Sequence, residues 1–197
     1  MVKLELPNEN ELVLGSTSNI LGESPISEEI GRIMGVLNST RDSGRETAPW
    51  PLVVFTLDGQ YALHLRNVER VVRAAEVTPL PRSPNIVLGV INAQGNILPV
   101  VNVRRRFRLI EREMEPTDRL IIAKTSMRRV ALLVDSVTGV IERAEDDVVR
   151  ADAIVPRTQY IEGVTKLDEN ILLIHDLDSF LSLDEERALD DALNSIS

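Results

Sequence analysis

The sequence predicts a mainly β protein whose strands are chiefly antiparallel and curl into small barrels. From Leu52 onward, short apolar runs such as LVVFTL, IVLGVINA and RVALLVD alternate with turn residues, a pattern typical of strands. No helical pattern of about 10–15 residues recurs between these runs, which argues against a parallel βαβ architecture. The chain has 197 residues, 43% of them hydrophobic, and no cysteine. A chain of this length can bury a core without disulfides, so we expect a folded domain over residues 49–197.

Residues 1–48 precede this domain and are predicted to form an extension with one helix and a linker. Ser24 and Pro25 match an N-cap followed by a proline at the first helical position. Apolar residues then recur every three or four positions, which indicates an amphipathic helix. The stretch from Asn38 to Thr47 is rich in Ser, Thr, Gly and charged residues and is typical of a linker, so the boundary falls near Pro49.

The first hairpin turns at Asp58-Gly59, and its register is open between two alternatives. A two-residue loop would pair Phe55 with Ala62. A three-residue loop, residues 58–60, would place three apolar pairs on one face: Leu57 with Tyr61, Phe55 with Leu63, and Val53 with Leu65. We expect the second register because it gives the more apolar face.

Turn and capping residues later in the sequence predict a second turn and a C-terminal helix. Gln94-Gly95-Asn96 separates two apolar runs, and Pro99 within the second run indicates an edge strand or a bulge. Ser182 followed by Glu185 three residues later is a capping-box pattern that begins a C-terminal helix. The helix has one apolar stripe, which must cover a surface: Ala188, Leu189, Ala192, Leu193 and Ile196.

Catalytic and metal-binding patterns are not found, and we predict no catalytic residue, cofactor or metal. His64 and His175 each lie inside a strand-like run, without a second His or a Cys at ligand spacing. The acidic runs at 142–147 and 184–191 are interpreted as solvated surface. No GxGxxG or GxxxxGK[ST] motif is present.

Charge and hydropathy narrow the range of partners. A net charge of −9 opposes binding to nucleic acid. The sequence contains no run of 18 consecutive apolar residues, which is about the length that a membrane-spanning helix needs. We therefore expect a cytoplasmic protein without direct membrane insertion. The basic cluster of residues 104–106 and Arg108 around Phe107 is interpreted as a protein-facing patch. The alternative is an anion site in a small β-barrel that binds a metabolite or an oligonucleotide.

Four blocks of the sequence, in this order, resemble the chemotaxis coupling-protein (CheW) family: FTLDGQYALHL, VTPLPRSPNIVLGVINAQGNILPVVNVRRRF, VALLVDSVTGV and YIEGVTKLDENILLIHDLDSFL. The resemblance implies two intertwined, SH3-like, five-stranded β-barrel lobes with a C-terminal helix. It also implies an adaptor without catalytic activity in receptor arrays at the inner face of the membrane. Its partners would be the regulatory domain of a CheA-like histidine kinase and the cytoplasmic tip of a methyl-accepting chemoreceptor.

In this family the receptor helix lies in a groove between the lobes, and the resemblance implies partner-binding positions there. By position, six residues are expected on or beside this groove: Val68, Val71, Gly89, Asn92, Gly95 and Leu133. Read from the residues alone, valines and leucines at strand spacing are more often core residues, and glycines are more often turn residues.

Three positions depart from the family pattern. Gln94 replaces the usual arginine, Arg70 a commonly acidic residue, and Asn102 an aspartate. Arg70 and Gln94 are counted among the partner-binding residues, since altered charges change which partner is selected. The alternative function is therefore a coupling protein of a non-flagellar system, such as twitching motility, phototaxis or a second-messenger pathway.

Overall fold

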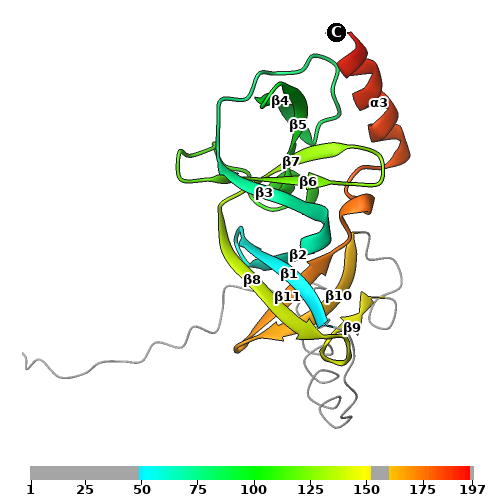
Figure 1. The fold of residues 1–197 in the computed structure, drawn as a ribbon. Helices are drawn as coiled ribbons and strands as arrows, with labels where there is room; N and C mark the ends of the chain where they lie inside the picture. The colour runs from blue at the N-terminus through cyan, green and yellow to red at the C-terminus, as the bar shows by residue number, and fades with distance from the viewer. Residues whose placement is uncertain (1–48, 152–159, 196–197) are drawn as a thin grey trace, which may run out of the picture.

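The computed structural model describes residues 49–151 and 160–195, which form two β-sheets and a C-terminal helix (Figure 1). Sheet A has six strands in the order β8-β1-β2-β11-β10-β9, and sheet B has five in the order β3-β6-β7-β5-β4. The mainly β prediction is confirmed. Five strands per lobe is correct for sheet B, whereas sheet A has a sixth strand, β9, of two residues. The predicted N-terminal helix and Ile196 lie outside the described residues.

The strands of sheet A are β1 (Pro49–Thr56), β2 (Gln60–His64), β8 (Ser136–Ala144), β9 (Val149–Arg150), β10 (Ile161–Leu167) and β11 (Asn170–His175). Those of sheet B are β3 (Val68–Arg73), β4 (Val87–Ala93), β5 (Asn96–Asn102), β6 (Arg119–Lys124) and β7 (Arg129–Val134). Helical elements are η1 (Leu65–Asn67), α2 (Val103–Arg106), η2 (Glu145–Asp147), η4 (Leu177–Ser179) and α3 (Leu183–Asn194). All the strands of sheet B lie between β2 and β8 in the chain, so the chain leaves sheet A once and returns to it.

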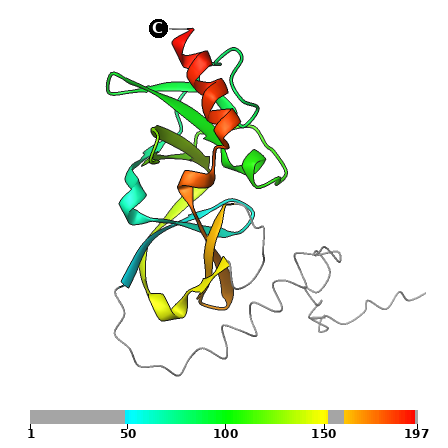
Figure 2. The ribbon, with the colours of Figure 1, turned by 90° about the vertical axis from the view of Figure 1, so that its right-hand side faces the viewer.

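The largest hydrophobic cluster joins both sheets to the C-terminal helix. In sheet B a row of paired residues crosses all five strands on this face: Val71, Ile121, Leu132, Val101 and Val87. Phe55 and Leu63 contribute from sheet A, and Leu189 and Ala192 contribute from α3. Figure 2 shows α3 lying along the sheet-B half of the molecule. The other face of sheet B has its own cluster, which includes Ile122.

The predicted start of α3 is confirmed, and its acidic face needs a correction. Ser182 and Glu185 form the capping box. Glu186, however, is buried, and its carboxylate lies 2.6 Å from Nε of Arg128 at the β6–β7 turn. Arg128 also pairs with Asp190 at 2.6 Å. The run at 184–191 is therefore partly an anchor for the helix and not only solvated surface, because a buried carboxylate needs a partner.

The predicted register of the first hairpin is wrong. Phe55 pairs with Tyr61, and Val53 pairs with Leu63, so the loop is residues 57–59. The shift is two residues, which keeps the same side chains on the same face because the side-chain period is two. The observed register stacks Phe55 on Tyr61 at 5.7 Å and lets the Tyr61 hydroxyl donate to Asp58 at 3.0 Å.

Pro99 does not mark an edge strand, because β5 lies between β4 and β7. Its partner Val90 exchanges both backbone hydrogen bonds with Thr78, so the polar groups of Val90 face away from β5. In such a non-hydrogen-bonded pair the nitrogen of Pro99 points away from β4, toward β7. Pairing with β7 begins only at Val100, so no ladder hydrogen bond is lost at the proline.

Candidate functional site

A β-bulge in edge strand β3 places two valines on one face. Val68 pairs with Ala123, whereas Arg70 pairs with Ile122 and Val71 with Ile121, so Glu69 is an extra residue. In a regular strand, residues three apart point to opposite faces. Here Val68 and Val71 both lie on the face toward the shared core, and Val71 remains 39% exposed.

Edge strand β8 of sheet A repeats this device. Val54 pairs with Gly139, and Phe55 pairs with Val137, so Thr138 is the extra residue. Val137 and Val140 therefore share the face of sheet A that contributes Phe55 to the core, although they lie three residues apart. Val140 is 56% exposed.

Val68 of β3 and Val137 of β8 both pack against the core that the two sheets share. In Figure 1, β3 crosses the junction between the sheets from right to left, and the end of β3 and the start of β8 lie on the left-hand side. Leu65, which follows β2 and is 38% exposed, adds a fifth branched side chain, from η1. We call this set the seam surface: Leu65, Val68, Val71, Val137 and Val140. Half-exposed aliphatic side chains of this kind, collected at one junction, suit an apolar partner.

Beside the seam surface, a set of polar residues connects edge strand β3 of sheet B to the turn that follows the other edge strand, β4. Arg70 lies on the opposite face of β3 from Val71, and its Nη1 donates to Oε1 of Gln94 at 2.7 Å. Gln94 and Gly95 form the two-residue turn between β4 and β5, with φ of 57° and 83°. Asn92 closes the turn by accepting from the Gly95 amide at 2.8 Å. We call Arg70, Asn92, Gln94 and Gly95 the turn cluster.

Gly89 is buried and structural. A Cβ at this position would lie 2.2 Å from the carbonyl oxygen of Thr78, and the φ of Gly89 is +152°. This close approach lets Thr78 pair with Val90. Gly89 therefore serves the packing of β4 against Thr78 and offers no side chain to a partner.

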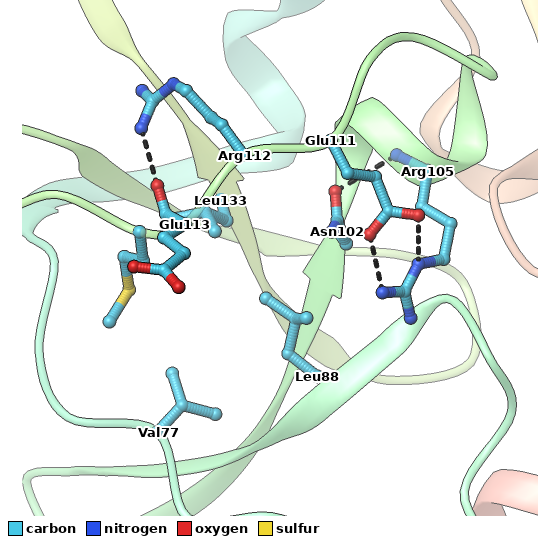
Figure 3. Close-up of a pocket in the computed structure, with 9 residues that line it drawn as sticks. Val77, Leu88, Asn102, Arg105, Glu111, Arg112, Glu113 and Leu133 are labelled. Carbon is cyan, nitrogen blue, oxygen red and sulfur yellow. Dashed lines mark hydrogen bonds and ion pairs between the residues drawn. The ribbon is translucent and has the colours of Figure 1, made fainter.

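Leu133 lies apart from the other sequence-predicted positions. It packs against the second cluster of sheet B and lines a depression of about 590 Å³, which we call the rim groove (Figure 3). The groove is lined by Val77, Leu88, Asn102, Arg105, Glu111, Arg112, Glu113, Met114 and Leu133. Asn102 is buried there as the N-cap of α2, where it accepts from the Arg105 amide at 3.0 Å. An aspartate could fill the same capping role.

The basic cluster is not a free patch. Arg104 pairs with Asp135 at 2.5 Å, Arg105 with Glu111 at 2.6 Å, and Arg106 with Glu185 at 2.6 Å. Arg106 also donates to the Tyr160 hydroxyl at 3.0 Å, which ties α2 to sheet A and α3. The three arginines therefore do not form an uncompensated basic patch or an open anion site, because each is paired with a carboxylate of the chain.

Both histidines are packed strand residues. His64 Nε2 lies 2.9 Å from Glu162, and this hydrogen bond lowers the pKa of Glu162 despite its partial burial. His175 Nδ1 contacts the Tyr160 carbonyl at 2.9 Å, and its ring stacks on Phe107 at 4.2 Å. Burial lowers the pKa of His175 to about 3, so its ring is neutral at physiological pH.

Within the described ranges, no group of three His, Cys, Asp or Glu side chains is placed to hold a metal ion. None of the helices in residues 49–151 and 160–195 is long and apolar enough to cross a membrane.

Sequence reasoning placed Val68 and Val71 at the surface but missed Leu65, Val137 and Val140. The sequence predicts that Leu65 pairs with Val53, but β2 ends at His64 and Val53 pairs with Leu63. A signal for the two β8 valines exists in Val137-Thr138-Gly139-Val140, because glycine in a strand often marks a bulge.

Comparison with known proteins gives consistent matches. Residues 51–185 match the family model described as CheW-like domain. The chemotaxis protein CheW of Thermotoga maritima is 30% identical over 128 residues, covering 64% of this chain and 84% of that protein. The chemotaxis protein CheW of Rhizobium meliloti is 29% identical over 152 residues, covering 75% of this chain and 94% of that protein.

A solved structure agrees in fold. The crystal structure of scaffolding protein TtCheW from Thermoanaerobacter tengcongensis matches with a TM-score of 0.64 and 28% identity, covering 70% of this chain and 96% of that one. The family model runs from β1 into the first turn of α3, and thus spans both sheets. The chain therefore belongs to the CheW-like domain family.

Proposed function

We propose that the protein is an adaptor that couples chemoreceptors to a chemotaxis-type histidine kinase, with the seam surface as the receptor-docking site. The relatives are named as chemotaxis proteins, and the similar structure as a scaffolding protein. The observation that carries the docking site is the pair of bulges, which expose valines from both sheets at one junction. Receptor tips would be met at the cytoplasmic face of the membrane, together with the regulatory domain of the kinase.

We further propose that each sheet closes as an SH3-like barrel. The hydrogen bond from Arg70 to Gln94 supports this closure for sheet B, since it joins edge strand β3 to the turn that follows edge strand β4. Closure would fix the seam surface and the turn cluster relative to each other. A receptor helix could then contact apolar side chains and a polar turn at once.

Replacing Val71 by aspartate should weaken binding to a purified receptor cytoplasmic tip by about tenfold or more, because a charge would be desolvated in an apolar contact. The melting temperature should fall only slightly, since Val71 is already 39% exposed. Isothermal titration calorimetry with the receptor tip, and separately with the kinase regulatory domain, measures both affinities. Kinase binding should be retained.

Leu183→Asp is the matched control for this experiment. Leu183 is 76% exposed and lies in the first turn of α3, where an added carboxylate is tolerated by the helix dipole. It changes the charge equally, away from the seam surface. Equal losses from the two variants would refute the docking site, and wild-type protein that binds neither partner would refute the adaptor function.

The turn cluster gives a second prediction, about partner choice. Gln94→Arg would place two guanidiniums against each other, so receptor affinity and melting temperature should both fall. Adding Arg70→Glu should restore an attractive pair and recover both quantities. Calorimetry and thermal denaturation of the single and double variants test this. A double variant as impaired as Gln94→Arg alone would show that the two side chains are not coupled.

A further inference from the structure

The floor of the rim groove is apolar and is provided by elements far apart in the chain. Leu88 comes from edge strand β4, where it is the extra residue of a bulge, since Val87 pairs with Val101 and Gly89 with Val100. Leu133 comes from β7, and Val77 from the segment before β4. All three side chains are half-buried, so the groove presents aliphatic carbon to solvent. The bulge directs Leu88 into the groove.

The polar rim is held in place by ion pairs. Arg112 pairs with Asp118 at 2.5 Å and with Asp135 at 2.9 Å, and Asp135 also holds Arg104. Burial raises the pKa of Asp118, but hydrogen bonds from Arg112 and from the Glu115 amide outweigh it, so the net pKa is lowered. On the other side of the groove, Arg105 and Glu111 form a two-bond pair. A rim held this way loses little conformational freedom on binding.

The charges around the groove do not balance. The lining contains Arg105, Arg112, Glu111 and Glu113. The network behind it adds Arg104 against Asp118, Asp135 and Glu115, so five carboxylates face three guanidiniums.

Glu113 is the carboxylate without a cation. Glu111, Glu115, Asp118 and Asp135 each have an arginine partner. Among the described residues, no arginine, lysine or histidine pairs with the side chain of Glu113. Figure 3 shows its carboxylate on the Val77 side of the pocket, and only its main-chain oxygen accepts from Arg112. A negative charge beside an apolar floor is complementary to a partner segment in which a cation lies next to an apolar side chain.

We propose that the rim groove is a second docking surface, and that it takes an apolar side chain flanked by a lysine or arginine of a protein partner. This inference rests on the proposed adaptor function, which requires a surface for the kinase regulatory domain while the seam surface holds the receptor. The apolar side chain enters between Leu88 and Leu133, and the cation pairs with Glu113. The groove is thereby selective for charge as well as for shape.

Glu113→Lys tests the electrostatic half of the proposal. Binding to the kinase regulatory domain should weaken about tenfold at low ionic strength, and the difference from wild type should shrink in about 0.5 M salt because the charges are screened. Binding to the receptor tip should be unchanged. The fold should be unaffected, because the substituted carboxylate has no ion pair among the described residues, and the melting temperature checks this.

Two further variants make the test decisive. Leu88→Ala should weaken kinase binding by a factor that does not depend on salt, since it removes only apolar contact. Glu169→Lys, an equal charge change at the exposed β10–β11 turn, should bind the kinase as wild type does. Kinase binding by Glu113→Lys equal to wild type would overturn the proposal, as would loss of receptor binding instead of kinase binding. If wild type binds neither partner, the adaptor function itself fails.

Discussion

Replacing Phe180 by alanine should lower the free energy of unfolding by about 3–5 kcal/mol, the largest effect of any single truncation that we expect. Phe180 is 1% exposed and follows η4, where the chain passes from sheet A to α3. Its ring meets Phe107 edge-on at 5.6 Å and His175 at 5.9 Å. The side chain therefore touches residues from both halves of the molecule, and its removal leaves a cavity where they join.

Urea denaturation followed by circular dichroism measures this loss. Leu183→Ala is the control, because Leu183 is 76% exposed three residues later and should change stability by less than about 0.5 kcal/mol. A Phe180→Ala protein as stable as this control would show that the two sheets do not share one core. A biphasic transition would show that the sheets unfold separately.

Gly89→Ala should lower the free energy of unfolding by about 2–4 kcal/mol, because the new methyl group overpacks its surroundings and because φ is positive at this position. The new Cβ would lie 2.2 Å from the Thr78 oxygen and 2.9 Å from a methyl carbon of Val77. Because both contacts lie at the base of β4, we expect the Thr78 and Val90 pairing to open. Hydrogen exchange at these two amides should rise more than at amides in sheet A.

Gly139 provides a closely matched control for Gly89. Its φ is +153°, but a Cβ there would meet no atom within 4 Å. Gly139→Ala therefore introduces the backbone strain without the steric contact, and it should lower the free energy of unfolding by only about 1 kcal/mol. Equal losses from the two variants would mean that close packing against Thr78 does not explain the glycine.

Much of the fold could be predicted from the sequence, because local signals agreed with the final structure. The capping box at Ser182 begins α3, and the turn at Gln94-Gly95 joins β4 to β5. The hairpin register failed because hydrophobicity favours any shift by two residues equally. The observed register stacks Tyr61 on Phe55, and this contact is visible only in the folded structure.

The site was predicted less completely, for reasons that the residues make plain. Arginines in a row suggested an exposed patch, but the carboxylates that neutralise Arg104 and Arg106 lie 31 and 79 residues away. The family resemblance groups Leu133 with Val68, yet the two residues lie on opposite faces of sheet B. Which face a residue occupies depends on bulges, and a bulge has no strong signature in a single sequence.

The bulges at Glu69 and Thr138 determine where a residue can be deleted from β3 and β8. Each inserts one residue into an otherwise regular ladder, and the pairing resumes on either side with the same faces. Deleting either residue would close the ladder and leave the valines on the face they occupy now. A residue lost from a regular part of either strand would turn the rest of that strand over. Glu69 and Thr138 are thus the places where β3 and β8 can be shortened without altering the seam surface.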